Sequence, residues 1–229
     1  MATIYLIRHG QASFGKDNYD QLSPTGWAQG RVLGRWLAGK VAAGAAFGGG
    51  LQRHRETLEA LGEGYGQPLP ALQTLPGLDE FDHMQVVERF RPEWADRGAM
   101  ARDLAASGKP ARTFQKAYEA AMVRWTSGDH DSDYTESWLG FQARVLAALD
   151  ELVARADGQD ALVATSGGPI AVITKQLLGL SDDKTLAINN VIANTSVSRV
   201  LYSGSRRSLA VFNNYSHLEA EDPALVTFR

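Results

Sequence analysis

Short apolar runs alternate along this chain with longer segments whose apolar residues recur at helical spacing. Residues 4–7 (IYLI) form a continuous apolar run, and residues 161–166 (ALVATS) form a second one. Such runs are typical of strands in a parallel sheet that is covered on both faces. Three further segments predict strands, the last two as a hairpin around Gly204: 45–50, 196–203 and 207–213. Strands that alternate with helices predict a three-layer α/β/α sandwich with a mostly parallel sheet.

Three segments carry clear helix signals. Ser23 and Pro24 supply an N-cap and a first helical residue, and the glycines that follow recur every four residues on one face, which permits close packing. Residues 51–61 predict a second helix, with Arg53 in its first turn. Residues 135–156 predict the longest helix, with one apolar stripe: Trp138, Phe141, Val145, Leu149, Leu152 and Val153.

Residues 84–134 have a different composition from the rest of the chain. They are rich in Arg, Glu, Trp and Ala, lack a strand signal and contain breakers at Pro92, Gly98 and Pro110. We interpret them as a helical cap inserted into a single domain that spans residues 1–229. Four residues of this cap are candidate substrate contacts, although a surface position fits them equally: Arg89, Arg91, Trp94 and Arg97.

Composition excludes several classes of function. The net charge of −3 gives no general attraction to nucleic acid or to an anionic membrane. The absence of cysteine excludes disulfides, thiolate metal sites and a cysteine nucleophile. No apolar run approaches the ~20 residues of a membrane helix, and the N-terminus shows no signal-peptide pattern. We therefore expect a cytoplasmic protein without a cofactor, and the oligomeric state, including a dimer, stays open.

Cationic and glycine-rich residues follow two of the predicted strands. Arg8, His9 and Gly10 come after the first strand, and Ser166 and Gly167 come after a later one. Ligands of open α/β sheets bind beyond the carboxyl ends of the strands. Two guanidiniums, an imidazole and a helix N-terminus suit a phosphoryl group. Taken singly, each signal also fits an ordinary turn or a solvated helix face; the histidines show no metal-ligand spacing, so no metal site is expected.

Seven segments in this order resemble the histidine phosphatase superfamily, which contains phosphatases and phosphoglycerate mutases. The resemblance runs almost from end to end of the chain and rests on these segments: LIRHG (6–10), LSPTGWAQG (22–30), LQRHRETL (51–58), LDEF (78–81), TESWLGFQARV (135–145), ATSGGPI (164–170) and NNYSHL (213–218). It implies an α/β sheet with a small helical cap and a metal-independent phosphatase that acts on a small phosphorylated substrate.

The resemblance also implies roles for individual residues. His9 matches the nucleophile that becomes phosphorylated, and Glu80 matches the proton donor. The phosphate would be bound by residues at the strand ends and on the second helix: Arg8, Gly10, Arg53, Ser166 and Gly167.

The chain departs from the family pattern at three places. Ser166 stands where the family usually has a second histidine, which would leave a neutral donor and a slower enzyme. Gly15 replaces an asparagine of many relatives, and glycines occupy 48–50 where serines are frequent. His83, three residues after Glu80, is either a replacement for the missing second histidine or an ordinary solvated loop residue.

Alternative functions follow from the same residues. A catalytically weak protein that binds a phosphorylated ligand, and a phosphoglycerate mutase, are both compatible with the motifs. A serine hydrolase with Ser166 as nucleophile and His217 downstream is a remote alternative, because the first glycine of G-x-S-x-G is missing.

Overall fold

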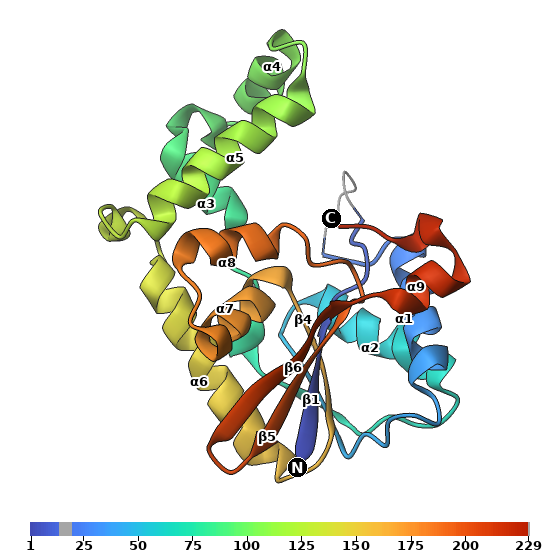
Figure 1. Cartoon of the computed structure of the whole chain (residues 1–229). Helices are drawn as coiled ribbons and strands as arrows, with labels where there is room; N and C mark the ends of the chain where they lie inside the picture. Colours follow the sequence, from blue (N-terminus) through green and yellow to red (C-terminus); the bar gives the residue numbers. More distant parts are fainter. Residues whose placement is uncertain (14–19, 229) are drawn as a thin grey trace. The chain divides into compact units, whose positions relative to one another are not determined.

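The computed structural model describes residues 1–13 and 20–228 and divides into two compact units (Figure 1). The first unit contains Met1–Glu80 and Arg144–Arg229, and the second contains Phe81–Ala143. Among the helices of the described residues, none is long and apolar enough to cross a membrane.

A six-stranded sheet forms the centre of the first unit, with strand order β3-β2-β4-β1-β5-β6. The four strands from β3 to β1 are parallel, and β5 and β6 run antiparallel to their neighbours. The predicted α/β sandwich with a mostly parallel sheet is therefore confirmed. The strands are β1 (Ala2–Arg8), β2 (Ala45–Gly48), β3 (Leu72–Thr74), β4 (Ala161–Thr165), β5 (Val197–Ser203) and β6 (Arg206–Asn214).

Helices cover both faces of this sheet. Figure 1 shows α1 and α2 on one face and α6 and α7 on the other. The helices and 3-10 turns that belong to this unit, wholly or in part, are α1 (Pro24–Leu37), α2 (Gln52–Tyr65), η1 (Pro76–Leu78), α6 (Trp138–Ala156), α7 (Gly167–Leu178), α8 (Asp182–Asn189), α9 (Ser216–Glu221) and η4 (Pro223–Leu225).

The central strands are buried as their apolar sequences predict. Every residue of β4 is buried, and Ile4, Leu6 and Ile7 of β1 have no exposed surface. The strand β3 was not predicted, because its three residues are exposed or half-buried and carry no apolar signal. Short edge strands of this kind are fixed by pairing with a neighbour, here β2, and not by their own pattern.

The first helix packs closely against the second through its glycines. A Cβ atom at Gly30 would lie 2.6 Å from Cβ of Ala60, and one at Gly34 would lie 2.1 Å from the carbonyl oxygen of Leu61. The predicted cap is also present, since Ser23 Oγ accepts a hydrogen bond from the Gly26 amide at 3.1 Å. The glycine repeat of α1 therefore serves close helix packing, as its spacing predicts.

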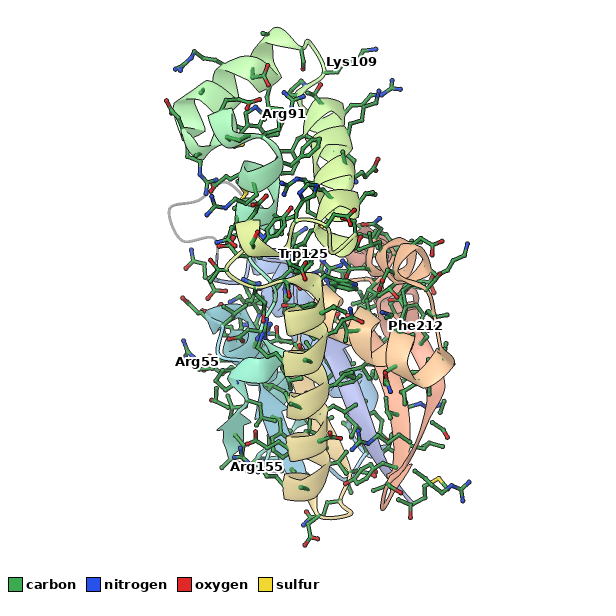
Figure 2. All side chains as sticks on the ribbon, turned by 90° about the vertical axis from the view of Figure 1, so that its left-hand side faces the viewer. Arg55, Arg91, Lys109, Trp125, Arg155 and Phe212 are labelled. Atoms are coloured by element: carbon green, nitrogen blue, oxygen red, sulfur yellow. The ribbon has the colours of Figure 1, made fainter. Side chains whose placement is uncertain are left out.

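The second unit is helical and has an aromatic core of its own. Its elements are α3 (His83–Phe90), η2 (Pro92–Ala95), α4 (Arg97–Ala106), α5 (Pro110–Thr126), η3 (Asp131–Asp133) and the first turn of α6. Trp125, labelled in Figure 2, is 1 % exposed, and its ring centroid lies 4.7 Å from that of Phe81.

Trp94 is a core residue of this unit and not the surface or substrate-contacting residue that the sequence suggested. Its side chain is 0 % exposed, and Nε1 donates a hydrogen bond to Asp103 Oδ2 at 2.9 Å. The ring stacks on Phe114 with a centroid distance of 6.1 Å. The guanidinium of Arg91 lies over the same ring and forms an ion pair with Glu93 at 3.3 Å.

A buried histidine in the first unit predicts that acid destabilises the fold. His217 of α9 is 2 % exposed and packs on Trp36, and burial lowers the pKa of its imidazole to about 4. An unfolded histidine has a pKa near 6.5, so between these values the unfolded state binds more protons and stability is lost as the pH falls. We expect this residue alone to cost about 2 kcal/mol between about pH 7.5 and pH 5.

Urea unfolding at both pH values measures this effect. His217→Gln should lose that share of the pH dependence, whereas the exposed control His130→Gln should keep the parental slope. Equal slopes in parent and His217→Gln would contradict the assignment.

Candidate functional site

The carboxyl ends of β1 and β4 lie side by side and bring the first two motifs together. The parallel register pairs Arg8 with Thr165, so His9 and Ser166 are the next residues on neighbouring strands. The amide of His9 donates to the Thr165 carbonyl at 2.8 Å. The side-chain amide of Asn194 donates to the His9 carbonyl at 3.0 Å. The backbone of His9 is therefore held from both sides.

The His9 side chain is held as a neutral imidazole. It is 6 % exposed, and Nδ1 lies 2.7 Å from the carbonyl oxygen of Gly10. A carbonyl only accepts, so Nδ1 carries the proton and the lone pair stands on Nε2. Burial, together with the charges of Arg53 and Arg8, holds the pKa of His9 well below its usual value. A neutral imidazole with its lone pair on Nε2 has the chemistry of a nucleophile.

Two guanidiniums lie within electrostatic reach of His9. Arg53, in the first turn of α2, is 8 % exposed, and its Nη1 donates to Asp20 Oδ1 at 2.7 Å. Arg8 donates through Nη1 to the carbonyls of Ile192 and Phe228. A Cβ atom on Gly167 would lie 3.9 Å from Arg8 Nε, so this arginine also faces the start of α7. The structure thus places both predicted arginines beside the predicted histidine.

The turn after His9 requires glycine because α1 passes directly over it. A Cβ atom at Gly10 would lie 2.6 Å from the Gly26 carbonyl oxygen. The Gly10 amide donates to Thr57 Oγ1 of α2 at 3.0 Å. The two helices therefore fix the loop that carries the imidazole.

The N-terminus of α7 brings Glu80 to the same strand ends. The helix begins at Gly167 with Ser166 as N-cap, and the Gly168 amide donates to Glu80 Oε2 at 3.2 Å. A helix N-terminus favours negative charge, which explains why a carboxylate lies there. A Cβ atom at Gly167 would lie 2.6 Å from Asn189 Oδ1, so a side chain there would require the Asn189 side chain to move.

Two further residues, His54 and Asp79, join this cluster. His54 Nε2 lies 2.8 Å from Ser166 Oγ, and His54 Nδ1 lies 3.6 Å from Asp79 Oδ1. The ring centroids of His54 and His9 are 5.8 Å apart. His54 is 0 % exposed, and burial lowers its pKa, although the Asp79 carboxylate opposes this shift. Ser166 is thus hydrogen-bonded to His54, and the Asp79 carboxylate faces the other nitrogen of the His54 ring.

Sequence reasoning passed over His54 because it selected the arginine beside it. A usable signal was present, since His54 precedes Leu58 and Leu61 at helical spacing and so belongs to the buried face of α2. A second signal was the glycine run at 48–50. A Cβ atom at Gly49 would lie 2.3 Å from His54 Nδ1 and 2.4 Å from Asp79 Oδ1. The glycine at position 49 therefore leaves space for this pair.

Other residues that the sequence singled out lie elsewhere. His217 contacts Thr195 and Trp36, and the imidazole that bonds Ser166 is His54, so the serine-hydrolase alternative had the wrong histidine. His83 begins α3, in the Phe81–Ala143 unit. Gly15 lies outside the described residues. Within the described part of the chain, no three His, Asp or Glu side chains are grouped as metal ligands.

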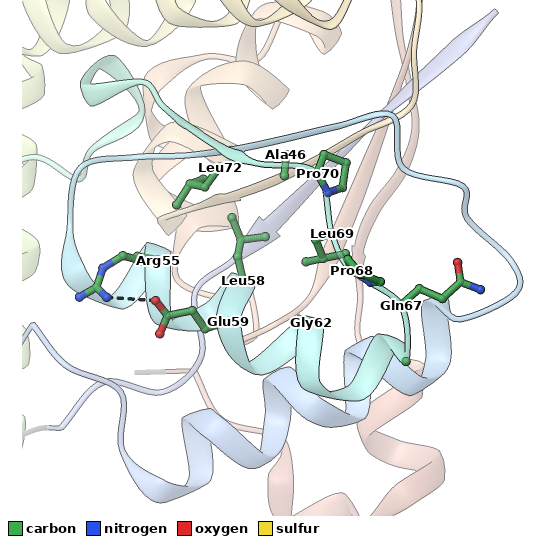
Figure 3. A pocket seen from close by; sticks show the side chains of 11 residues that line it. Ala46, Arg55, Leu58, Glu59, Gly62, Gln67, Pro68, Leu69, Pro70 and Leu72 are labelled. Atoms are coloured by element: carbon green, nitrogen blue, oxygen red, sulfur yellow. Dashed lines mark hydrogen bonds and ion pairs between the residues drawn. The ribbon is translucent and has the colours of Figure 1, made fainter.

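A groove of about 630 Å³ opens at a separate place in the first unit (Figure 3). Figure 3 shows Leu58 and Leu72 beside it, and Arg55 paired with Glu59. None of the predicted site residues lines it. Arg55 lines this groove and Arg53 does not, so the two arginines lie on different faces of α2.

The sequence and the fold match known proteins. Residues 4–107 and 104–215 match a family model described as the histidine phosphatase superfamily (branch 1). No curated protein matches the chain significantly.

Solved structures share the fold at low sequence identity. The phosphoglycerate mutase from Bacillus anthracis has a TM-score of 0.66 and 18% identity, with 95% of each chain covered. The α-ribazole phosphatase from Shigella flexneri has a TM-score of 0.63 and 19% identity, with 93% of this chain and 96% of that chain covered. A mycobacterial glucosyl-3-phosphoglycerate phosphatase, solved with inorganic phosphate, has a TM-score of 0.59 and 21% identity, with 95% of this chain and 99% of that chain covered.

Proposed function

The chain belongs to the histidine phosphatase superfamily (branch 1), and we propose that it is a metal-independent phosphomonoester phosphatase acting through a phosphohistidine on His9. The observation that carries the proposal is the neutral His9 imidazole, with Nδ1 held by the Gly10 carbonyl and two arginines within reach. We also propose that the Phe81–Ala143 unit is the helical insertion expected at residues 84–134.

The first step transfers the phosphoryl group to the enzyme. Nε2 of His9 attacks phosphorus and the bond to the leaving oxygen breaks, while Glu80 gives its proton to that oxygen. Arg8 and Arg53 stabilise the phosphoryl oxygens by charge-assisted hydrogen bonds. The backbone amides at the start of α7, at Gly167 and Gly168, add the favourable field of a helix N-terminus.

The second step returns the enzyme to its starting state. The Glu80 carboxylate takes a proton from water, and the resulting nucleophile attacks the phosphohistidine. The phosphorus–nitrogen bond breaks, inorganic phosphate leaves, and the lone pair returns to His9 Nε2. No other group is consumed, so the cycle needs only the phosphomonoester and water.

The names of the structural relatives support a small phosphorylated molecule as substrate. They include an α-ribazole phosphatase, a glucosyl-3-phosphoglycerate phosphatase and a phosphoglycerate mutase. Two of these three relatives are phosphatases, and we propose hydrolysis for this chain as well. A weak phosphate-binding protein is the outcome to be distinguished by assay.

A panel of phosphomonoesters with and without EDTA tests the proposal, and Arg53 supplies its sharpest variant. The parent should release inorganic phosphate equally in both conditions. Arg53→Ala should weaken vanadate binding by about 2 kcal/mol, roughly 30-fold, since hydrogen bonds between charged groups are strong and Asp20 would lose its ion pair with Arg53.

Arg55→Ala is the matched control, because Arg55 lies in the same helix turn, is exposed and pairs with Glu59. It should bind vanadate like the parent. A parent that binds vanadate but hydrolyses none of the panel would favour the binding protein. Equal affinities of Arg53→Ala and Arg55→Ala would remove Arg53 from the site.

A further inference from the structure

Three buried or half-buried polar side chains form a chain of contacts that ends beside His9. Asp79 Oδ1 lies 3.6 Å from His54 Nδ1, and His54 Nε2 lies 2.8 Å from Ser166 Oγ. His54 and Ser166 are both 0 % exposed. Ser166 Oγ and His54 Nε2 satisfy each other, whereas His54 Nδ1 is buried without a hydrogen-bond partner and faces the Asp79 carboxylate, an arrangement that costs free energy.

The surrounding backbone is shaped to hold this chain of contacts. The Gly50 amide donates to Asp79 Oδ1 at 2.5 Å and fixes the carboxylate. Gly49 leaves the space that His54 and Asp79 fill, since a Cβ atom there would lie within 2.4 Å of both side chains. The α2 helix, the loop after β2 and the segment after η1 therefore contribute together to one local arrangement.

The hydroxyl end of the chain lies next to residues that we propose to bind the phosphoryl oxygens. Ser166 follows Thr165, whose carbonyl accepts from the His9 amide at 2.8 Å. Gly167 comes next, and a Cβ atom there would lie 3.9 Å from Arg8 Nε. Asp20 pairs with Arg53 at 2.7 Å, which offsets one of the two arginine charges near His9.

The same three residue types form the nucleophilic triad of serine hydrolases, but this geometry does not favour that role. The Ser166 backbone is extended, with φ −114° and ψ 173°, and shows no strained turn. A nucleophile elbow holds its serine exposed on a strained turn. The neighbouring His9 already offers a lone pair on Nε2.

We propose that Asp79, His54 and Ser166 act as one relay, in which His54 gains a proton when an oxyanion binds and Ser166 then donates its hydroxyl hydrogen to that oxyanion. The inference rests on the proposed site at His9 but concerns binding, and it holds whether or not bound esters are hydrolysed. His54 is then a positioning residue that acts through Ser166.

The proton balance of the relay is simple. In the free protein burial lowers the pKa of His54, so its ring is neutral; Nδ1–H faces Asp79 and Nε2 accepts the Ser166 hydroxyl hydrogen. On binding, Nε2 takes one proton from solvent and donates to Ser166 Oγ, which frees the hydroxyl hydrogen for the oxyanion. The charged or titratable groups that face His54 are Asp79, Asp20, Arg53 and His9.

Nuclear magnetic resonance of the histidine-labelled (¹⁵N) full-length protein tests the relay directly, with orthovanadate as the probe. The His54 signals, assigned by their loss in His54→Gln, should change from a neutral ring to a ring protonated on both nitrogens when vanadate is added. A merely structural histidine would not change its protonation. A His54 ring that stays neutral in the vanadate complex overturns the relay.

Vanadate affinities of variants provide the second arm. Ser166→Ala and His54→Gln should each weaken binding by about 10- to 100-fold, the range for hydrogen bonds to charged groups. The double variant should be no weaker than the worse single variant, because members of one unit are not additive. Two buried residues outside the relay are the controls: Ser198→Ala and His217→Gln should both bind like the parent.

The outcomes separate the relay from the proposed function. A parent that binds vanadate with protonation of His54 but hydrolyses no phosphomonoester supports the relay and contradicts the phosphatase. Additive losses in the double variant, or labelling of Ser166 by a fluorophosphonate, contradict the relay while phosphohistidine formation on His9 can still be observed. If His54→Gln fails to fold, the vanadate affinity of Ser166→Ala, which keeps the His54 ring, still tests the relay, and an affinity equal to that of the parent overturns it.

Discussion

Replacing His9 with alanine is expected to lower turnover of every phosphomonoester to near background, a loss of at least about 10³-fold, since the variant lacks the group that accepts the phosphoryl. The structure gives the reason. The imidazole is neutral, its Nδ1 proton is held by Gly10, its Nε2 carries the lone pair, and the charges of Arg53 and Arg8 act on the ring. Alanine keeps the loop, because the loop is fixed by backbone bonds to Thr165 and Thr57.

Rapid mixing with an aryl phosphate, followed by a quench under alkaline conditions, measures the intermediate. The parent should carry acid-labile phosphate on the peptide that contains His9, and His9→Ala should carry none. The exposed His130→Ala is the control and should label like the parent. Unchanged turnover in His9→Ala, or phosphate on another peptide, would contradict the mechanism.

Replacing Glu80 with glutamine is expected to have the next largest effect, and the effect should depend on the leaving group. For an alkyl phosphate, kcat/KM should fall by about 10²- to 10⁴-fold, because a poor leaving oxygen must be protonated as its bond breaks. For an aryl phosphate, kcat/KM should fall far less, because that leaving group departs as an anion. Glutamine retains an acceptor for the Gly168 amide, so the start of α7 keeps its partner.

Steady-state kinetics with the two substrate types check this expectation. The ratio kcat/KM reports the steps up to phosphoryl transfer, and so it isolates proton donation from the later hydrolysis. Asp82→Asn is the matched control, since Asp82 lies two residues away and caps α3 through the Gln85 amide at 2.9 Å. Equal losses on both substrates would make Glu80 a structural residue.

Much of the fold could be predicted from the sequence because the signals are local. Three such signals each lie within a few neighbouring residues: the apolar run at Ile4–Ile7, the Ser23–Pro24 cap and the Gly30–Gly34 spacing. The structure places a buried strand, a capped helix and a close helix contact at these positions. Side-chain type largely decides whether a residue is buried, whether it caps a helix and how closely two helices can approach. The sequence pattern therefore predicts these features of the structure.

The main residues of the candidate site could be predicted from the sequence, although each motif by itself is a weak signal. Seven motifs in the order of one family are much more specific than any one of them. Arg8, His9, Arg53, Glu80 and Ser166 are dispersed over the chain, and the structure brings them together at the ends of β1 and β4. Their catalytic roles stay a proposal that the variants above test.

Sequence alone therefore determined the buried strands, the capped helices and the residues that follow the strand ends. Only the tertiary structure decided which histidine meets Ser166, that Trp94 is core, and that β3 pairs at the sheet edge. The relay joins residues from α2, from the segment after η1 and from the end of β4. Strand order and helix packing decide which residues from such distant segments come into contact. A local pattern of residue types therefore cannot predict a hydrogen bond between them.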